Sequence, residues 1–207
     1  CGSAPVLAQQ GWRAAPLRPR DRLDGVWQEL GRSAPRAGRV GGLAGPAAPI
    51  LEMVKAYDLL LPRLRADPLF AERPFDGVDT LLHELSRVAD VVLGIATGHR
   101  TDTIAPALQT LRWAEFFRTI QAADTAPSKP HPAMLLQALA ATGVEAKDAI
   151  FIGDTTFDMR MAEAAQLRSI GVAWGHHDAD RLQAAGAHHA AKTVDELRTT
   201  IHAALGE

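Results

Sequence analysis

The chain has 207 residues, of which 22% are charged, with a formal net charge of −2 and a single cysteine. This length can bury one sizeable core and leaves room for a small second domain. The weak net charge argues against the basic surface of nucleic-acid-binding and anionic-membrane-binding proteins, and one cysteine excludes an internal disulfide. No apolar run reaches transmembrane length, and we expect a cytoplasmic protein with no nucleic-acid or membrane partner.

The N-terminal segment, residues 1–48, has an atypical composition. Of the first 50 residues, 30 are Ala, Gly, Arg or Pro, and none is Lys, Phe, Tyr, His, Thr or Met. Such density of Gly, Pro and Ala without apolar periodicity favours a flexible segment. We therefore expect residues 1–48 to be poorly ordered, with little regular structure.

From residue 50 onward, the apolar pattern predicts alternating helices and strands. A helix is expected over 50–66, kinked or divided at Pro62. The elements that follow are a helix at 78–88, strand 91–96, helix 101–112, strand 117–121, helix 133–142 ended by Gly143, strand 149–153, helix 158–166, strand 169–173, and helices 178–185 and 194–205. This alternation predicts an α/β core over 75–207 with a parallel, doubly wound sheet.

Two aspartates follow the apolar run at 149–153. Asp154 comes directly after it, and Asp158 comes four residues later, where a helix is expected to begin. Open α/β sheets bind ligands at the carboxyl ends of their strands, and two carboxylates there suit Mg²⁺. The alternative is that both residues only cap the helix, which is a common use of aspartate.

Thr97 and Gly98 stand at the end of a second apolar strand, before the helix expected from Thr101. A hydroxyl group and backbone N–H groups beside a helix N-terminus can form a phosphate cradle. The alternative is an ordinary turn between a strand and a helix.

Lys129 lies in a third segment, Ser128-Lys129-Pro130-His131-Pro132, which prolines hold stiff. A lysine in such a loop is a compact positive charge that can approach a phosphate or a carboxylate. A solvated surface lysine is the alternative.

These three motifs together resemble the haloacid dehalogenase-like hydrolase superfamily, in its phosphoglycolate-phosphatase-like branch. The resemblance rests on Gly94-Ile95-Ala96-Thr97-Gly98, on the Lys129 loop, and on Gly153-Asp154-Thr155-Thr156-Phe157-Asp158. It implies a Rossmann-like core and a helical cap, of which residues 49–74 would be a remnant. It also implies Mg²⁺ as cofactor and a small phosphorylated metabolite as substrate.

The resemblance further implies a mechanism through an aspartyl-phosphate, in which an aspartate at the end of the first strand attacks phosphorus. In that scheme Thr97 and Gly98 bind the phosphate, and Lys129 neutralises the phosphoryl oxygens. Asp154 binds Mg²⁺, and Asp158 binds it or orients its waters.

The first motif of the superfamily, an apolar strand followed by Asp-x-Asp-Gly-Thr, is not recognisable. The nearest candidate holds Asp21 and Asp24, but aligning Asp24 with the second aspartate puts Arg22 at the nucleophile position. The preceding run, 17–20, contains two arginines and a proline, which make a poor central strand. We therefore assign no nucleophile. A reading-frame shift or a truncated gene would give such an N-terminal segment, and the other two frames of the coding DNA test this.

Three functions remain open from the sequence. They are a Mg²⁺-dependent phosphatase of a phosphoglycolate-like metabolite, a phosphosugar mutase of the same superfamily, and a non-catalytic phosphate-binding fold without a nucleophile. The pairs His176-His177 and His188-His189 are expected to be exposed loop residues rather than metal ligands, with His176 bordering the active-site crevice.

Overall fold

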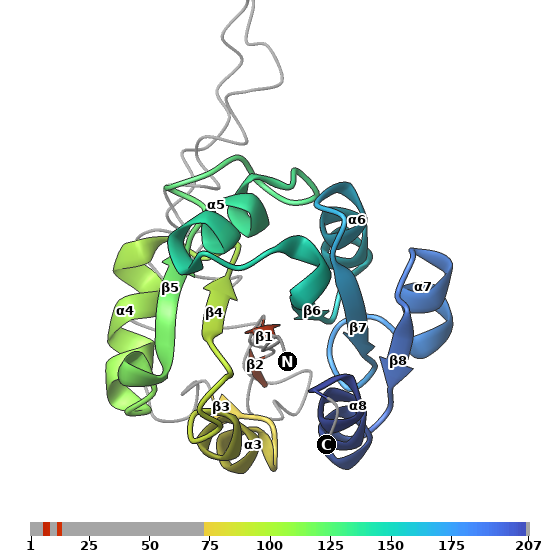
Figure 1. Ribbon diagram of the computed structural model, residues 1–207, viewed down its shortest axis with the longest axis horizontal. Coiled ribbons are helices and arrows are strands. Elements are labelled where there is room, and N and C mark those ends of the chain that lie inside the picture. Colours follow the sequence, from red (N-terminus) through yellow and green to blue (C-terminus); the bar gives the residue numbers. More distant parts are fainter. Residues whose placement is uncertain (1–5, 9–11, 14–72, 206–207) are drawn as a thin grey trace, which may run out of the picture. The chain divides into compact units, whose positions relative to one another are not determined.

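The computed structural model describes residues 6–8, 12–13 and 73–205 (Figure 1). The strands in these ranges are β1 (Val6–Ala8), β2 (Trp12–Arg13), β3 (Arg73–Pro74), β4 (Leu93–Ala96), β5 (Phe117–Gln121), β6 (Ile150–Gly153), β7 (Arg168–Val172) and β8 (His189–Ala191). The helices are α3 (Val78–Leu85), α4 (Thr101–Thr110), α5 (Ala133–Thr142), α6 (Thr156–Ala164), α7 (Ala179–Ala184) and α8 (Val194–Leu205), with short 3₁₀ turns η2 (Ala114–Phe116) and η3 (Ala146–Asp148).

The chain divides into two units in an order that interrupts the first one. Residues 1–12 and 74–207 form one unit, and residues 13–73 form the other. The second unit is thus inserted in the chain between β1 and α3, and it includes residues 49–73 of the segment predicted to be a cap remnant. The predicted cap remnant over 49–72 and the predicted helix at 50–66 lie outside the described residues.

Six strands form one sheet in the order β5-β4-β1-β6-β7-β8, and every neighbouring pair is parallel. From β1 the chain proceeds through β4 to β5 on one side, and then through β6, β7 and β8 on the other. The direction therefore reverses between β1 and β6, and open α/β sheets bind ligands at such a point, at the carboxyl ends of the strands. Strands β2 and β3 form a separate two-stranded sheet.

Both faces of the main sheet are buried under helices, which confirms the predicted doubly wound α/β fold. In β6, Ile150 and Ile152 belong to an apolar cluster with residues of α3, α4 and α8, whereas Phe151 belongs to a second cluster with residues of α5 and α6. Successive side chains of a strand point to opposite faces, so a strand buried on both faces has a continuous apolar sequence. Figure 1 shows α5 and α6 on one side of the sheet and α3 and α8 on the other.

Helix boundaries follow capping residues that the apolar pattern does not show. Helix α6 begins at Thr156, two residues before the predicted start, because Thr155 caps it. Helix α7 begins at Ala179, since the side chain of Asp178 accepts a hydrogen bond from the Arg181 N–H at 2.9 Å. Gly143 ends α5 as predicted, with a left-handed φ of 72° that glycine adopts without strain. In the described ranges, no helix is long and apolar enough to cross a membrane.

Strand β1 was not predicted, and it lies in the centre of the sheet. It pairs with β4 and with β6, and Ala8 is level with Ile95 on one side and Ile152 on the other. The expectation of little regular structure over 1–48 therefore does not hold at residues 6–8 and 12–13, while residues 14–48 lie outside the described residues. A three-residue run is too short to show periodicity, and its extended conformation depends on two neighbouring strands that are distant in sequence.

Candidate active site

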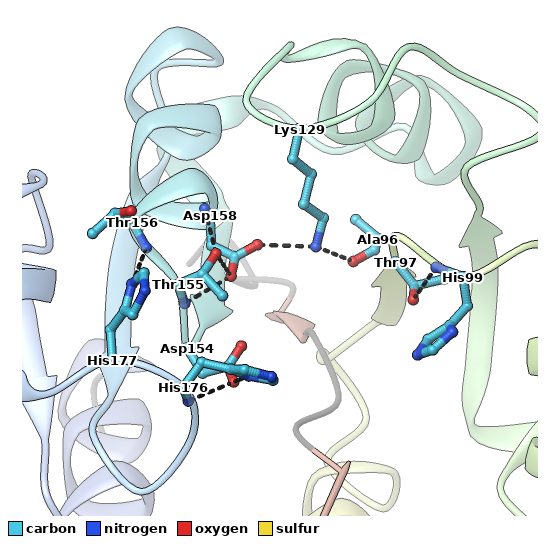
Figure 2. A network of polar contacts seen from close by, with 10 residues as sticks. All are labelled: Ala96, Thr97, His99, Lys129, Asp154, Thr155, Thr156, Asp158, His176 and His177. Atoms are coloured by element: carbon cyan, nitrogen blue, oxygen red, sulfur yellow. Dashed lines mark hydrogen bonds and ion pairs between the residues drawn. The ribbon is translucent and has the colours of Figure 1, made fainter. Parts of the chain in front are cut away.

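Three loops at the carboxyl edge of the sheet bring the predicted site residues together (Figure 2). Thr97 directly follows β4, Asp154 directly follows β6, and Asp158 lies in the first turn of α6. Lys129 comes from the loop between β5 and α5, and its Nζ donates to the carbonyl oxygen of Ala96 at 3.0 Å and to Asp158 Oδ1 at 2.9 Å. These contacts join segments 33 and 29 residues apart, so the predicted convergence is confirmed. The roles assigned to the residues stay predictions.

The ammonium group of Lys129 is buried at the centre of this arrangement, and only 10% of the side chain is exposed. Burial lowers the pKa of Lys129 below its usual value, against the opposing effect of the negative charges of Asp158 and Asp154. An ammonium group has three N–H donors, and the described residues accept two of them. Among the described residues the third donor has no acceptor, and it could donate to an anion. The alternative of a solvated surface lysine is excluded.

The Asp158 carboxylate is fully buried and both of its oxygens are bonded. Oδ1 accepts from Lys129, and Oδ2 accepts from the N–H of Thr155 at 2.9 Å and from its hydroxyl group at 2.7 Å. The N–H of Asp158 in turn donates to the Thr155 hydroxyl oxygen at 3.2 Å, which completes a capping box. Asp158 thus both takes part in the cap of α6 and orients Lys129, whereas the N-cap residue is Thr155 and not Asp154. A Cβ atom at Gly153 would lie 2.5 Å from the Asp158 Cβ, so the glycine makes room for this carboxylate.

The Asp154 carboxylate is also buried, but the described residues bond only one of its oxygens. Oδ2 accepts from the backbone N–H of His176 at 3.1 Å and contacts Nδ1 of its ring at 2.6 Å. No hydrogen bond from the described residues ends on Oδ1. Gly175 makes this contact possible, because a Cβ atom there would lie 2.4 Å from the Asp154 Cβ and from Oδ2.

Thr97 is buried beside the end of β4, and its contacts with the described residues use its N–H and its hydroxyl oxygen. Its N–H donates to the carbonyl oxygen of Gln121 at 2.9 Å, and its Oγ1 accepts from the N–H of His99 at 3.1 Å. Among the described residues, no acceptor receives the hydroxyl proton of Thr97. Gly98 lies on the exposed turn that follows, and no atom lies within 4 Å of a Cβ placed there.

The histidine loop after β7 is a part of the site whose contacts the sequence did not predict. The expectation that His176 borders the site is borne out, and 73% of its side chain is exposed. His177 was expected to be only an exposed loop residue, but its Nδ1 accepts from the N–H of Thr156, at the start of α6, at 3.0 Å. By contrast, the ring of His188 accepts from the N–H of Ser169, remote from the carboxylates. The available signal was a histidine pair directly after Gly175, in the segment that follows β7.

The chemistry of these residues fits Mg²⁺ through a single carboxylate. In the described part of the chain, no group of three or more His, Cys, Asp or Glu side chains could hold a metal ion by itself. Mg²⁺ needs only one or two protein carboxylates, because water and substrate phosphate fill its other positions. Asp154 Oδ1 meets this requirement, whereas both oxygens of Asp158 are already bonded. Of the two predicted ligands, Asp154 is therefore the better donor.

Comparison with known proteins relates the chain to a family of hydrolases. Residues 66–172 match the haloacid dehalogenase-like hydrolase family. A phosphoglycolate phosphatase of Xylella fastidiosa (strain 9a5c) is 32% identical over 178 residues, which cover 84% of this chain and 69% of that protein. A protein of Dickeya dadantii named probable phosphatase IndB is 39% identical over 93 residues, 45% of this chain and 40% of that protein.

Among solved structures, a haloacid dehalogenase-like family hydrolase from Streptococcus pneumoniae superposes with a TM-score of 0.68 at 22% identity. The match covers 97% of this chain and 98% of that chain, and it establishes the shared fold. The chain spans about half the length of the first curated relatives that it matches, 40% of the Dickeya protein and 52% of a second Xylella phosphoglycolate phosphatase.

Proposed function

Because the chain belongs to the haloacid dehalogenase-like hydrolase family, we propose that its site binds the phosphoryl group of a small phosphomonoester and is built to hydrolyse it with Mg²⁺. Phosphoglycolate-like metabolites are the substrate class that we propose, since phosphoglycolate phosphatases are among the relatives. The geometry adds a second part to the proposal. As it stands, this chain binds the phosphoryl group but turns it over slowly.

The buried Lys129 is the observation that carries the phosphoryl-binding proposal. Taking a lysine out of water is costly unless its charge is paired, and Asp158 supplies that pair at 2.9 Å. The ammonium group still keeps one N–H donor beyond its two described acceptors. A phosphoryl oxygen, which is a charged acceptor, would bind this donor strongly.

Two further groups would act on the same phosphoryl group from the neighbouring strand ends. The Thr97 hydroxyl proton has no acceptor among the described residues and would donate to a second phosphoryl oxygen. Asp154 would hold Mg²⁺ through Oδ1, and the bound ion would offset negative charge on the phosphate. Phosphoryl transfer depends mainly on positioning and charge neutralisation, which Thr97, Lys129 and Asp154 would supply.

The residues that follow β1 explain why we propose slow turnover. The aspartyl-phosphate mechanism needs an aspartate at the end of the first strand, between β4 and β6. In this chain Ala8 ends β1, the next residues in the sequence are Gln9, Gln10 and Gly11, and the first acidic residue of the chain is Asp21. An amide is a far weaker nucleophile than a carboxylate. The same observation favours the non-catalytic alternative, a phosphate-binding fold without turnover.

A phosphate-release assay tests the proposed function. The unaltered chain is given a panel of small phosphomonoesters, phosphoglycolate included, with Mg²⁺ or with a chelator. We expect release that is slow but depends on Mg²⁺ and on Asp154, because the charge-stabilising groups remain in place. Asp154→Asn should remove the Mg²⁺ dependence. Release that is insensitive both to the chelator and to Asp154→Asn would contradict the proposal.

A further inference from the structure

The loop that follows β7 lies against Asp154 (Figure 2), which it contacts through His176 and His177. The backbone N–H of His176 donates to Oδ2 at 3.1 Å, and Nδ1 of its ring lies 2.6 Å from the same oxygen. The N–H of His177 donates to the Asp154 carbonyl oxygen at 3.1 Å. The loop thus holds both the side chain and the backbone of this residue.

The direction of the ring contact follows from the chemistry of the two groups. An ionised carboxylate can only accept hydrogen bonds, so Nδ1 of His176 carries the proton and donates it to Oδ2. Two N–H donors from one residue therefore end on the same oxygen. They restrict rotation of the carboxylate, which leaves Oδ1 as the oxygen without a hydrogen-bond partner in the described part of the chain.

We propose that His176 is a positioning residue that fixes the Asp154 carboxylate so that Oδ1 binds the divalent cation. The inference rests on the proposed function, in which Asp154 holds that cation. A carboxylate already fixed by donors to one oxygen loses less freedom when the other oxygen binds an ion, and ligand carboxylates are oriented by such outer contacts.

Two neighbouring features indicate that the loop is shaped for this contact. Gly175 carries no side chain, and a Cβ atom there would overlap the Asp154 carboxylate at 2.4 Å. The ring of His177 accepts the N–H of Thr156 at 3.0 Å, which ties the loop to the first turn of α6. The His176 ring itself is 73% exposed, so it contributes little to the apolar core.

The test measures binding of Mn²⁺, whose free form is visible by electron paramagnetic resonance, to the full chain. We expect His176→Ala to weaken Mn²⁺ binding about fivefold to tenfold, with His176→Asn partly restoring it because the amide can donate to Oδ2. The melting temperature should change little, since the ring is mostly exposed. The matched control is His83→Ala, which removes another exposed histidine facing an aspartate, Asp79, at 3.9 Å but remote from the site.

A second pair of variants tests the attachment of the loop to α6 separately from the direct contact of His176 with Asp154. His177→Ala removes the acceptor of the Thr156 N–H, and His188→Ala removes a similar acceptor from the Ser169 N–H. We expect His177→Ala to weaken Mn²⁺ binding about twofold to threefold and His188→Ala to leave it unchanged.

The outcomes distinguish this inference from the proposed function. Mn²⁺ binding that Asp154→Asn abolishes but His176→Ala leaves intact would overturn the positioning role alone. Binding that Asp154→Asn leaves intact, or no binding by the unaltered chain, would overturn the cation site and the inference together. Equal losses in His176→Ala and His83→Ala would also overturn the inference, because they would show a general effect of removing a histidine.

Discussion

Strands β1 and β6 lie side by side in the centre of the sheet, yet acidic residues follow β6 and uncharged residues follow β1. β6 is followed by Asp154 and Asp158, whose carboxylates are buried. His176 donates hydrogen bonds to Asp154, and Lys129 and Thr155 donate to Asp158. β1 is followed in the sequence by Gln9, Gln10 and Gly11. The position of a strand depends on its backbone hydrogen bonds and apolar side chains, whereas the chemistry depends on the residues beyond its end. A strand can therefore hold its position in the sheet without catalytic residues beyond its end.

The largest expected effect comes from placing aspartates after β1, where the sequence has Gln9, Gln10 and Gly11. In the order of the motif, the double variant Gln9→Asp with Gly11→Asp places aspartates directly after the strand and two residues further on. We expect Mg²⁺-dependent phosphomonoester hydrolysis to rise about a thousandfold or more, since a covalent nucleophile accounts for several orders of magnitude of rate. Phosphate release by the double variant and by the unaltered chain measures this.

The control for that experiment adds Asp154→Asn to the double variant, which should abolish the Mg²⁺-dependent rate. If the double variant stays as slow as the unaltered chain, the difference between β1 and β6 is not a matter of the missing carboxylates alone.

The second-largest expected effect is a loss of stability when Lys129, whose buried ammonium group pairs with Asp158, is replaced. Lys129→Met leaves the fully buried Asp158 carboxylate without its charge partner, and we expect the free energy of unfolding to fall by about 3 kcal/mol. Urea unfolding measures this. Lys147→Met is the matched control, because Lys147 pairs with Glu145 on the surface and its removal should have no measurable effect. Equal losses in both variants would show that burial of the pair is not the cause.

A smaller effect is expected at the glycine that lets the loop approach Asp154. In Gly175→Ala the new Cβ atom would lie 2.4 Å from Asp154 Oδ2, so the carboxylate or the loop must move. We expect Mn²⁺ binding to weaken about tenfold, as small displacements of a ligand have large effects on a metal site. If Gly175→Ala binds Mn²⁺ as tightly as the unaltered chain does, crowding at Gly175 has no role.

The smallest predicted effect is a pH dependence that belongs to Lys129. Burial lowers its pKa in the folded state, so on raising the pH the folded protein releases this proton before the unfolded chain does. Stability should therefore gain a contribution as the pH rises from the folded-state pKa of Lys129 towards 10.5, the ordinary pKa of a lysine side chain. The difference in unfolding free energy between the unaltered chain and Lys129→Met, followed over that range, measures it. A difference that changes in the opposite direction would show that the ion pair outweighs burial.

The same contrast between strands shows what could be predicted from the sequence. The strands at 117–121 and 150–153 and the helices at 133–142 and 194–205 follow from apolar patterns and a terminal glycine, which are local signals. Thr97, Lys129 and Asp154 were found because each stands directly after an apolar strand or in a stiff loop. Strand β1 could not be found in this way, because three residues carry no periodicity.

Two parts of the site depend on tertiary contacts that no local pattern contains. The contact of His176 with Asp154 joins residues 22 positions apart, and it requires the loop after β7 to return across the end of β6. The bonding of both Asp158 oxygens, which makes Asp154 the better cation ligand, likewise depends on Lys129, 29 residues away. The types of residue were visible in the sequence, but their division of roles was not.

Equilibrium binding of inorganic phosphate to the unaltered chain, measured by calorimetry with Mg²⁺ present, tests most directly whether phosphoryl binding persists without the nucleophile. We predict that phosphate binds the unaltered chain, that Lys129→Met weakens this binding at least about tenfold, and that Lys147→Met does not. No binding by the unaltered chain, or equal binding by both variants, would contradict the assignment of this sheet edge as a phosphoryl-binding site.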